Sequence, residues 1–495
     1  MVGEGLIGGA DLPAARGRGS GQGGPPRGPA IRTQMPTRST NLELPGPVAR
    51  AWMARGTFDM QHRYRAMIAD DAASEGVWLR DVDGNTYLDL FANFALGALG
   101  YNHPALVATA ASPAFVAAAI NPTSTPFVTT PEWIHFLEEV ARHAPAGMSR
   151  IYCVDGGGEG VESALKAAFI RHGERARVAA GRPADPLQLT PDEQCAVMDN
   201  VGTDAVVISF SGAFHGRGLA PMSATHSKLI HKADLPAFPW PTCLFPANRF
   251  PLAQFHEENA AAEAASLAQL ERLLDAHAGK VAAILVEPIQ SEGGDRHASP
   301  AFFRGVQALA RRAGAAFILD EVQTGMGMSG TLWAHEQLGL PTPPDMVTFG
   351  KKMQMGGFFA VPEYDIGQFG RMYQTRNGDR ARAMLAATTL RTIASDGLLT
   401  HVRDTGAYFL ARLEELAARY PTLVTQPRGR GFLLAFDLPT PALRDDFNAR
   451  ALRQGVFASY TGVRSVRIRP HLITTRAHVD EAMGVFFEVA GALAG

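Results

Sequence analysis

The sequence has only three cysteines among 495 residues: Cys153, Cys195 and Cys243. They are far apart and show no metal-ligand spacing, so we expect no disulfide framework, no metal site and a reducing, cytoplasmic location. The chain also lacks any apolar stretch near the ~20 residues that span a bilayer. Its formal net charge is only −2 and it has no long basic run, which argues against nucleic-acid and membrane partners.

What remains is the composition of an ordinary globular enzyme, with 46% hydrophobic and 19% charged residues. A chain of this length can bury a large core and is expected to form two or more domains. The first 40 residues differ, because they are rich in Gly, Pro and Arg and poor in residues that pack. We expect residues 1–40 to be a disordered extension, with a targeting peptide as the less favoured alternative.

Two short apolar runs each lead into a chemically active side chain. Residues 315–319 show no polar alternation, which is typical of a strand buried on both faces, and Asp320 follows them. Residues 346–349 form a similar run and are followed by Gly350 and Lys351. Because parallel strands end at the edge of the sheet where ligands bind, we expect Asp320 and Lys351 to lie side by side.

A carboxylate beside a lysine in a dry cleft suits pyridoxal phosphate. Desolvation activates the lysine as a nucleophile, and the pyridinium nitrogen of this cofactor needs an acidic partner to stay protonated. The residues alone leave a second interpretation open, in which both groups are ordinary surface side chains.

Other buried-strand patterns lie at residues 149–154, 205–210 and 281–286, and helical segments separate them. This alternation predicts an α/β fold with a large, doubly wound parallel or mixed sheet. A run of glycines, residues 156–158, stands between the first of these strands and a helix, so it is either an anion-binding turn or a plain turn. Residues 76–91 read as a hairpin, and beyond residue 385 helices and strands alternate in a smaller α+β pattern.

Five motifs give the chain a resemblance to a known family: GAFHGR (212–217), EPIQSEGGD (287–295), LDEVQTG (319–325), TFGKK (348–352) and SVRIRP (465–470). From about residue 45 onward the chain resembles the class III aminotransferases, pyridoxal-phosphate enzymes of fold type I. Within the class it is similar to 4-aminobutyrate aminotransferases through residues 226–241, and to L-lysine 6-aminotransferases through residues 90–106. The resemblance implies an N-terminal segment (41–105) that contributes to a small domain and to the active-site entrance, a large cofactor-binding domain (106–385) and a C-terminal small domain (386–495).

The resemblance also implies roles for the residues around the cofactor. Lys351 matches the lysine that carries pyridoxal 5'-phosphate, and Asp320 matches the partner of its pyridinium nitrogen. Gln323 matches a residue near the 3-hydroxyl, and Phe214 matches a ring that stacks on the cofactor. Lys352 then has no direct role and is either a supporting or a surface lysine.

The phosphate of the cofactor is expected at Gly157 and Gly158, with Thr375 reaching it from the neighbouring subunit of a homodimer that shares its active sites. Many class members have a hydroxyl residue where Gly158 stands, so this contact must use backbone N–H groups. Animal 4-aminobutyrate aminotransferases carry a cysteine pair where this chain has Gly156 and Glu159, so no iron-sulfur cluster is expected.

Substrate recognition is expected to depend on two arginines. Arg217 matches the arginine that holds the distal carboxylate of both substrates, and Arg467 matches the one that meets the α-carboxylate of glutamate. Glu287 is expected to pair with Arg467 when the donor has no α-carboxylate, since a buried cation would otherwise stand alone. Without the resemblance, these residues would be read as structural ion pairs.

The expected reaction moves the terminal amine of an ω-amino acid to 2-oxoglutarate, giving L-glutamate and an aldehyde. The favoured donor is 4-aminobutyrate, whose product is succinate semialdehyde, and L-lysine is the alternative. A catalytically silent pyridoxal-phosphate-fold binding protein is the remote alternative, which the set of matched residues argues against.

Overall fold

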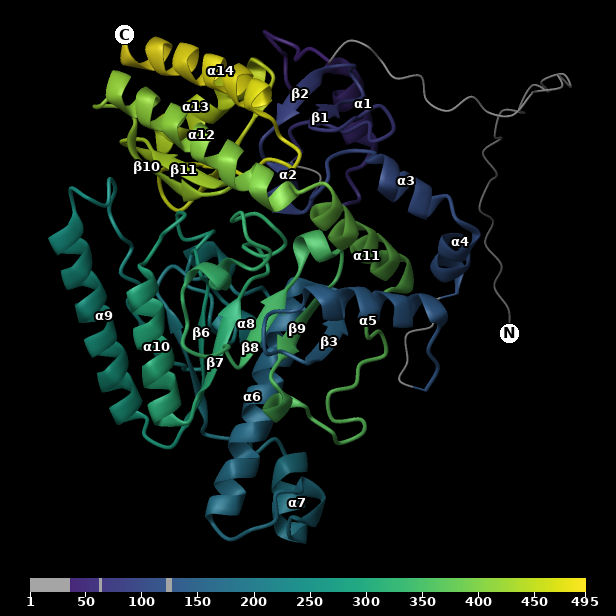
Figure 1. Cartoon of the computed structure of the whole chain (residues 1–495), viewed down its shortest axis with the longest axis vertical. Coiled ribbons are helices and arrows are strands. Elements are labelled where there is room, and N and C mark those ends of the chain that lie inside the picture. Colours follow the sequence, from purple (N-terminus) through teal and green to yellow (C-terminus); the bar gives the residue numbers. More distant parts are fainter. Residues whose placement is uncertain (1–35, 62–64, 122–126) are drawn as a thin grey trace, which may run out of the picture. The chain divides into compact units, whose positions relative to one another are not determined.

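The computed structural model describes residues 36–61, 65–121 and 127–495. At its centre lies a seven-stranded sheet with the order β3-β9-β8-β7-β6-β4-β5 (Figure 1). In chain order these strands are β3 (Arg150–Val154), β4 (Val206–Phe210), β5 (Thr242–Cys243), β6 (Val281–Val286), β7 (Ala316–Asp320), β8 (Met346–Phe349) and β9 (Gly356–Ala360). The strands expected from the apolar runs are present.

Strand β9 runs antiparallel to both its neighbours, whereas β4 to β8 run parallel, so the sheet is mixed. The sequence did not predict β9, because two glycines at its start interrupt the apolar pattern. Both are needed for close packing: a Cβ at Gly357 would lie 2.1 Å from the carbonyl oxygen of Tyr152, and one at Gly356 would lie 1.9 Å from that of Gly156. The two glycines that allow β9 to pack closely also remove the apolar pattern by which a strand is recognised in a sequence.

Helices cover both faces of the sheet: α6 (Gly157–Ala179) packs on one face, and α10 (Pro300–Ala313) packs on the other. In β6, Ala283 and Leu285 join the hydrophobic cluster of α6, while Ile284 and Val286 join the cluster of α10. Because successive side chains of a strand point to opposite faces, burial on both sides demands the continuous apolar runs seen in the sequence. Helix α9 (His256–Ala276) packs outside α10 (Figure 1).

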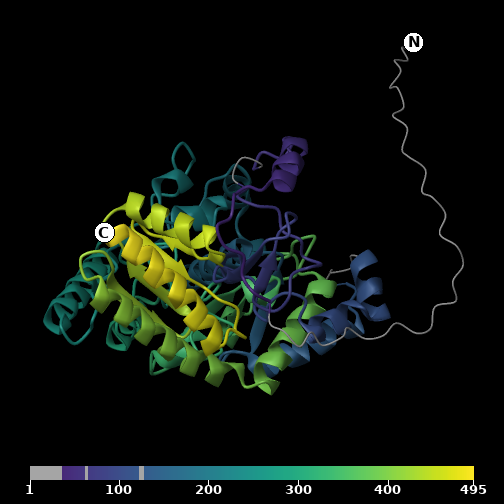
Figure 2. The ribbon, with the colours of Figure 1, turned by 90° about the horizontal axis from the view of Figure 1, so that it is seen from above.

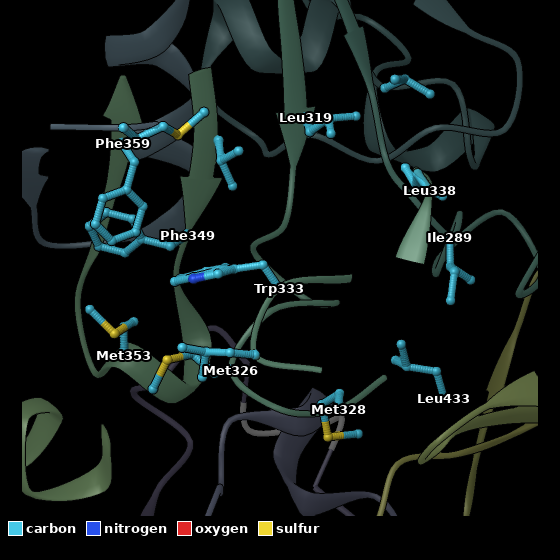
Figure 3. Packing of buried hydrophobic residues seen from close by; sticks show 14 of the residues in the cluster. Ile289, Leu319, Met326, Met328, Trp333, Leu338, Phe349, Met353, Phe359 and Leu433 are labelled. Atoms are coloured by element: carbon cyan, nitrogen blue, oxygen red, sulfur yellow. The ribbon is translucent and has the colours of Figure 1, made fainter. Parts of the chain in front are cut away.

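Trp333 anchors the chain that follows β7. Its ring lies 5.2 Å from the ring of Phe359, which in turn lies 4.9 Å from that of Phe349, and its indole N–H donates to the carbonyl oxygen of His143 at 2.8 Å. Methionines 326, 328 and 353 lie in the same cluster, as Figure 3 shows. The segment that begins at Asp320 is therefore held against the sheet by close packing.

A second group of elements contains the C-terminal part of the chain. Its four-stranded antiparallel sheet has the order β10-β11-β14-β13. The strands are β10 (Thr425–Arg430), β11 (Leu433–Asp437), β13 (Ser459–Thr461) and β14 (Ser465–Ile468), and the helices packed with them are α12 (Leu398–Arg419), α13 (Pro441–Arg453) and α14 (Arg476–Ala494). Figures 1 and 2 show these helices together, with α12 and α14 side by side.

Segments far apart in the sequence meet in a third, small sheet. Strands β1 (Trp78–Arg80) and β2 (Thr86–Asp89) form the expected hairpin, and β12 (Val456–Phe457) adds to β2 in parallel. A helix begins at Pro104 as expected: α3 (Pro104–Ala110). It is followed by α4 (Pro113–Ile120) and α5 (Pro131–His143), and α11 (Arg380–Ser395) packs against all three.

Residues 38–495 form one compact unit. The three domain boundaries expected from the sequence stay a prediction. The expected disordered extension lies, for residues 1–35, outside the described part of the chain. No helix in the described part is both long and apolar enough to cross a membrane.

Candidate active site

A cavity of about 280 Å³ lies at the carboxyl ends of β6, β7 and β8. Most of the residues that the sequence analysis selected line it. They are Gly157, Gly158, Phe214, Glu287, Asp320, Gln323 and Lys351. The edge of a doubly wound sheet at which its strands end is where such folds bind ligands.

Asp320, the last residue of β7, is 4% exposed and accepts three hydrogen bonds. The donors are Nδ1 of His215 at 2.7 Å, the backbone N–H of Val322 at 3.1 Å and the hydroxyl of Thr348 at 2.9 Å. Burial alone would raise the pKa of this carboxyl, but the contact with His215 and the other bonds lower it below the usual value. Asp320 is therefore a fixed, charged carboxylate inside the cavity.

Lys351 follows β8 and Gly350 and begins a short 3₁₀ turn, Lys351–Met353. Its backbone has φ of +49°, a conformation that costs energy for a residue with a side chain and that clusters at functional sites. Burial lowers the pKa of its amine, and the negative charge of Asp320 opposes this shift. A lowered pKa increases the fraction of unprotonated amine, which is the nucleophilic form.

The glycine turn also lines the cavity. Helix α6 begins at Gly157, so the first N–H groups of the helix have no acceptor within it and can bind an anion. Close approach explains the glycines: a Cβ at Gly157 would lie 2.6 Å from Cγ1 of Val322, and one at Gly216 would lie 2.9 Å from the Cα of Gly158. Of the two interpretations of this run, the anion-binding turn is the one that the geometry supports.

These residues fit pyridoxal phosphate. The free N–H groups at the start of α6 suit its phosphate, the charged carboxylate of Asp320 suits its ring nitrogen, and the amine of Lys351 suits its aldehyde carbon. When bound, the cofactor supplies an electron sink for the carbanion that forms as a proton leaves carbon. The ring of Phe214 lines the same cavity and is available to stack on it.

The expected pairing of Glu287 with Arg467 is wrong, because the guanidinium of Arg467 forms its ion pair with Glu292. Glu292 lines the cavity, and Nζ of Lys228 lies 3.3 Å from its second oxygen. Burial would raise the pKa of Glu292, but Arg467 first and Lys228 second lower it to about 2. Glu292 is therefore the carboxylate that neutralises the buried Arg467.

Glu287 follows β6 directly, and its partners are backbone N–H groups. Its carboxylate accepts the backbone N–H of Phe214 at 2.9 Å and that of Ser291 at 3.1 Å. Burial and the nearby charge of Asp320 raise its pKa well above the usual value. These contacts tie the segment with Phe214 to the turn that carries Glu292, so Glu287 supports the site.

Two residues were missed by reasoning from the sequence. His215 orients Asp320, and its only sequence signal was its place between Phe214 and Arg217. Glu292 gave a stronger signal, since it lies beside two glycines in a loop after a buried strand and so has the freedom to reach across the cavity. The resemblance pointed to Glu287, and only the folded turn distinguishes the two.

Three predicted residues are not among those that line the cavity: Arg217, Thr375 and Arg467, of which Arg467 is buried. Arg217 is exposed, with its guanidinium carbon 5.9 Å from the ring centroid of Phe214, and Thr375 is also exposed. Gln323 lines the cavity, but its side-chain oxygen accepts from Nε of Arg469 at 3.2 Å. Lys352 is completely buried, so its interpretation as a surface lysine is wrong.

Comparison with known proteins agrees with this site. Residues 60–489 match the family described as aminotransferase class-III. A 4-aminobutyrate aminotransferase of Dictyostelium discoideum is 38% identical over 446 residues, which cover 90% of this chain and 89% of that protein. The mitochondrial 4-aminobutyrate aminotransferase of Sus scrofa is 36% identical over 452 residues, with 90% and 89% covered.

Among solved structures, a lysine aminotransferase from M. tuberculosis in the internal aldimine form is similar, with a TM-score of 0.81 and 33% identity. The match covers 90% of this chain and 99% of that one. The expected fold and cofactor are thereby confirmed. The chain belongs to the class III aminotransferases, which are pyridoxal-phosphate-dependent transaminases of fold type I.

Proposed function

We propose that this protein is an ω-aminotransferase that moves the terminal amino group of an ω-amino acid to 2-oxoglutarate, with 4-aminobutyrate as the favoured donor. The products are then succinate semialdehyde and L-glutamate, formed in two half-reactions at one site. The observation that carries the proposal is the ion pair between buried Arg467 and Glu292, a residue that lines the cavity.

This pair suits an enzyme that must accept two kinds of substrate. An ω-amino acid such as 4-aminobutyrate has no carboxylate on the carbon that bears the reacting amine, so Arg467 keeps Glu292 as its partner. Glutamate and 2-oxoglutarate bring a carboxylate to that place, and it can take the guanidinium from Glu292. The loop around Glu292 then changes partners while no buried charge is left alone.

The other site residues have separate proposed roles in binding the cofactor and the substrates. Lys351, whose pKa is lowered by burial, is placed to carry the cofactor and, as a free amine, to take the proton from the substrate carbon that bears the amino group. Asp320 holds positive charge at the ring nitrogen, and His215 holds Asp320 in one orientation. Arg217 is proposed to bind the distal carboxylate of both substrates, after a movement or with the help of a second subunit, since it is exposed in the single chain.

A homodimer with shared active sites forms part of the proposal, with Thr375 contacting the phosphate bound by the partner subunit. Support comes from the exposed apolar surface near Thr375. Phe127 and Phe369 are exposed and contact each other, and a cavity of about 630 Å³ next to them is lined by Trp133 and Tyr373. Exposed apolar patches of this kind mark interaction surfaces. A cytoplasmic location stays a prediction.

L-lysine is the second candidate donor. The solved lysine aminotransferase supports it, together with the resemblance of residues 90–106 to lysine enzymes. Lysine would place its carboxylate farther from the reacting amine and would add an α-amine that needs an acceptor. The wall that decides between the donors includes Leu96, which lines the cavity.

The test is a donor panel with purified protein, pyridoxal phosphate and 2-oxoglutarate, in which glutamate formation is measured. The panel contains 4-aminobutyrate, L-lysine, L-ornithine, β-alanine and putrescine. We expect the highest kcat/KM for 4-aminobutyrate, and a higher value for L-lysine would transfer the assignment to the second candidate. If no glutamate forms with any of the five donors, the ω-aminotransferase function itself is contradicted.

A further inference from the structure

The chain between β2 and α3 makes an unusual left-handed turn beside the active site. Four successive residues have positive φ: Ala92 at 43°, Asn93 at 48°, Phe94 at 59° and Ala95 at 63°. None of them is glycine, and the left-handed conformation crowds the Cβ of every L-residue. Such a segment persists only where its surroundings hold it, and it is then a candidate for function.

Two buried side chains hold this turn, one at each end. At its start, Oδ1 of Asp89 accepts the N–H of Phe91 at 2.8 Å and that of Ala92 at 2.9 Å. At its end, Nζ of Lys352 donates to the carbonyl oxygen of Ala95 at 3.1 Å. The turn is therefore fastened to the strand before it and to the residue that follows Lys351.

Lys352 is an unusual group for this task. It is 0% exposed, and its only hydrogen bonds in the described part of the chain go to the carbonyl oxygens of Ala95 and Gln323, the latter at 3.2 Å. Burial, together with the charges of Lys351 and Arg469, lowers its pKa well below the usual value. A buried amine without a carboxylate partner is costly, so an apolar side chain would be expected here if only packing mattered.

The two carbonyls that Lys352 bridges belong to two chain segments that both contribute residues to the cavity lining. Gln323 lies in the segment that follows β7 and lines the cavity, and Leu96, next to Ala95, lines it as well. The turn also carries Phe94, whose ring centroid lies 5.3 Å from the guanidinium carbon of Arg467. The guanidinium of Arg467 therefore lies over the face of this ring at cation–π distance, while its Nη1 donates to the carboxylate of Glu292.

We propose that Lys352 is a positioning residue: by joining the carbonyl oxygens of Ala95 and Gln323, it keeps Phe94 on Arg467 and so sets how tightly the site binds a substrate's second carboxylate. The inference rests on the proposed function, in which Arg467 receives that carboxylate. Lys352 acts through the turn and through Phe94, and it touches neither substrate nor cofactor.

The test compares two simple ligands of the cofactor-loaded enzyme by isothermal titration calorimetry. Glutarate carries two carboxylates and needs Arg467, whereas butyrate carries one and does not. Lys352→Met fills the same volume but cannot donate, and we expect it to weaken glutarate binding about tenfold, the size of a lost cation–π contact, while butyrate binding changes less than about twofold. The absorbance of the bound cofactor should not change.

The matched control is Lys280→Met, which makes the same substitution at an exposed lysine paired with Asp204 and should change neither affinity. Phe94→Ala is the second variant, and it tests the inference even if Lys352→Met fails to fold, because Phe94 is 48% exposed. It should reproduce the loss of glutarate affinity. The double variant should then bind glutarate no more weakly than the weaker single variant, since both changes remove one contact.

Each arm has a distinct outcome. If the unaltered enzyme binds glutarate no better than butyrate, the proposed use of Arg467 fails, whatever the variants do. If it prefers glutarate but Phe94→Ala leaves that preference intact, the inference about Lys352 is overturned. Equal losses for both ligands in Lys352→Met, or additive losses in the double variant, would also overturn it and leave Lys352 a purely structural residue.

Discussion

Glu292 forms the ion pair with Arg467, and Glu287, five residues earlier, instead accepts two backbone N–H groups. Glu287 is buried and Glu292 is partly buried, and their surroundings move the two pKa values in opposite directions. That of Glu292 falls to about 2, because Arg467 and Lys228 favour its charge, whereas that of Glu287 rises well above the usual value. Glu292 is thus a charged partner that a substrate carboxylate can replace at Arg467, whereas Glu287 joins the segments of Phe214 and Ser291.

The first prediction concerns Lys351. Lys351→Ala should abolish covalent attachment of the cofactor and almost all turnover, because no other amine is placed to do its work. Lys352→Met is the control, and it should keep the cofactor absorbance, since Lys352 donates to two carbonyl oxygens away from the cofactor. Mass spectrometry after borohydride reduction measures the site of attachment, and a pyridoxyl adduct on Lys352 would contradict the assignment.

Asp320→Asn tests the partner of the ring nitrogen. The substitution keeps the shape of the side chain but removes the charge that holds a proton on that nitrogen. We expect the cofactor to bind and proton removal from the donor to slow by ~10²-fold or more, about 2.7 kcal/mol of barrier. Single-turnover absorbance measurements follow this step, and an unchanged rate would show that another residue serves the nitrogen.

Arg467 and Glu292 should have different effects on the two half-reactions. Arg467→Ala removes the partner of the α-carboxylate, so the half-reaction with 2-oxoglutarate should fall by about 30-fold to several thousand-fold, equivalent to about 2–5 kcal/mol. Glu292→Gln leaves Arg467 without a charged partner and should shift donor preference toward α-amino acids.

Stopped-flow measurement of each half-reaction separately provides the comparison. Glu287→Gln is the matched control, and it should leave the preference between α- and ω-amino donors unchanged. Equal losses in both half-reactions for Arg467→Ala and Glu292→Gln would mean that the pair is structural and that no exchange of partners takes place.

The lowered pKa of Glu292 predicts a pH dependence of stability. A carboxyl with a depressed folded-state pKa stabilises the protein above its unfolded pKa, here about 4.5, and loses this contribution as the pH falls toward 2. By pH 3.5 the contribution should have fallen by about 1 kcal/mol. Urea unfolding of the protein and of Glu292→Gln between pH 6 and pH 3.5 measures this. A difference between them that stays constant with pH would contradict the assigned shift.

Much of the fold was readable from local sequence patterns, for a definite physical reason. Strands β6, β7 and β8 are buried on both faces, and only unbroken apolar runs satisfy that burial. The start of α6 was also marked locally, because Gly157 stands where a Cβ would meet Val322. By contrast, β9 could not be predicted, because the glycines that let it pack remove the strand pattern.

By itself the sequence determined which residues stand at strand ends, and so it placed Asp320 and Lys351 in one site. Tertiary structure alone decided which side chains meet across that site. The choice of Glu292 over Glu287 as partner of Arg467, the contact of His215 with Asp320, and the burial of Lys352 between two carbonyls all join segments far apart in the chain. Such contacts depend on how separately specified elements pack together, and no local pattern encodes that geometry.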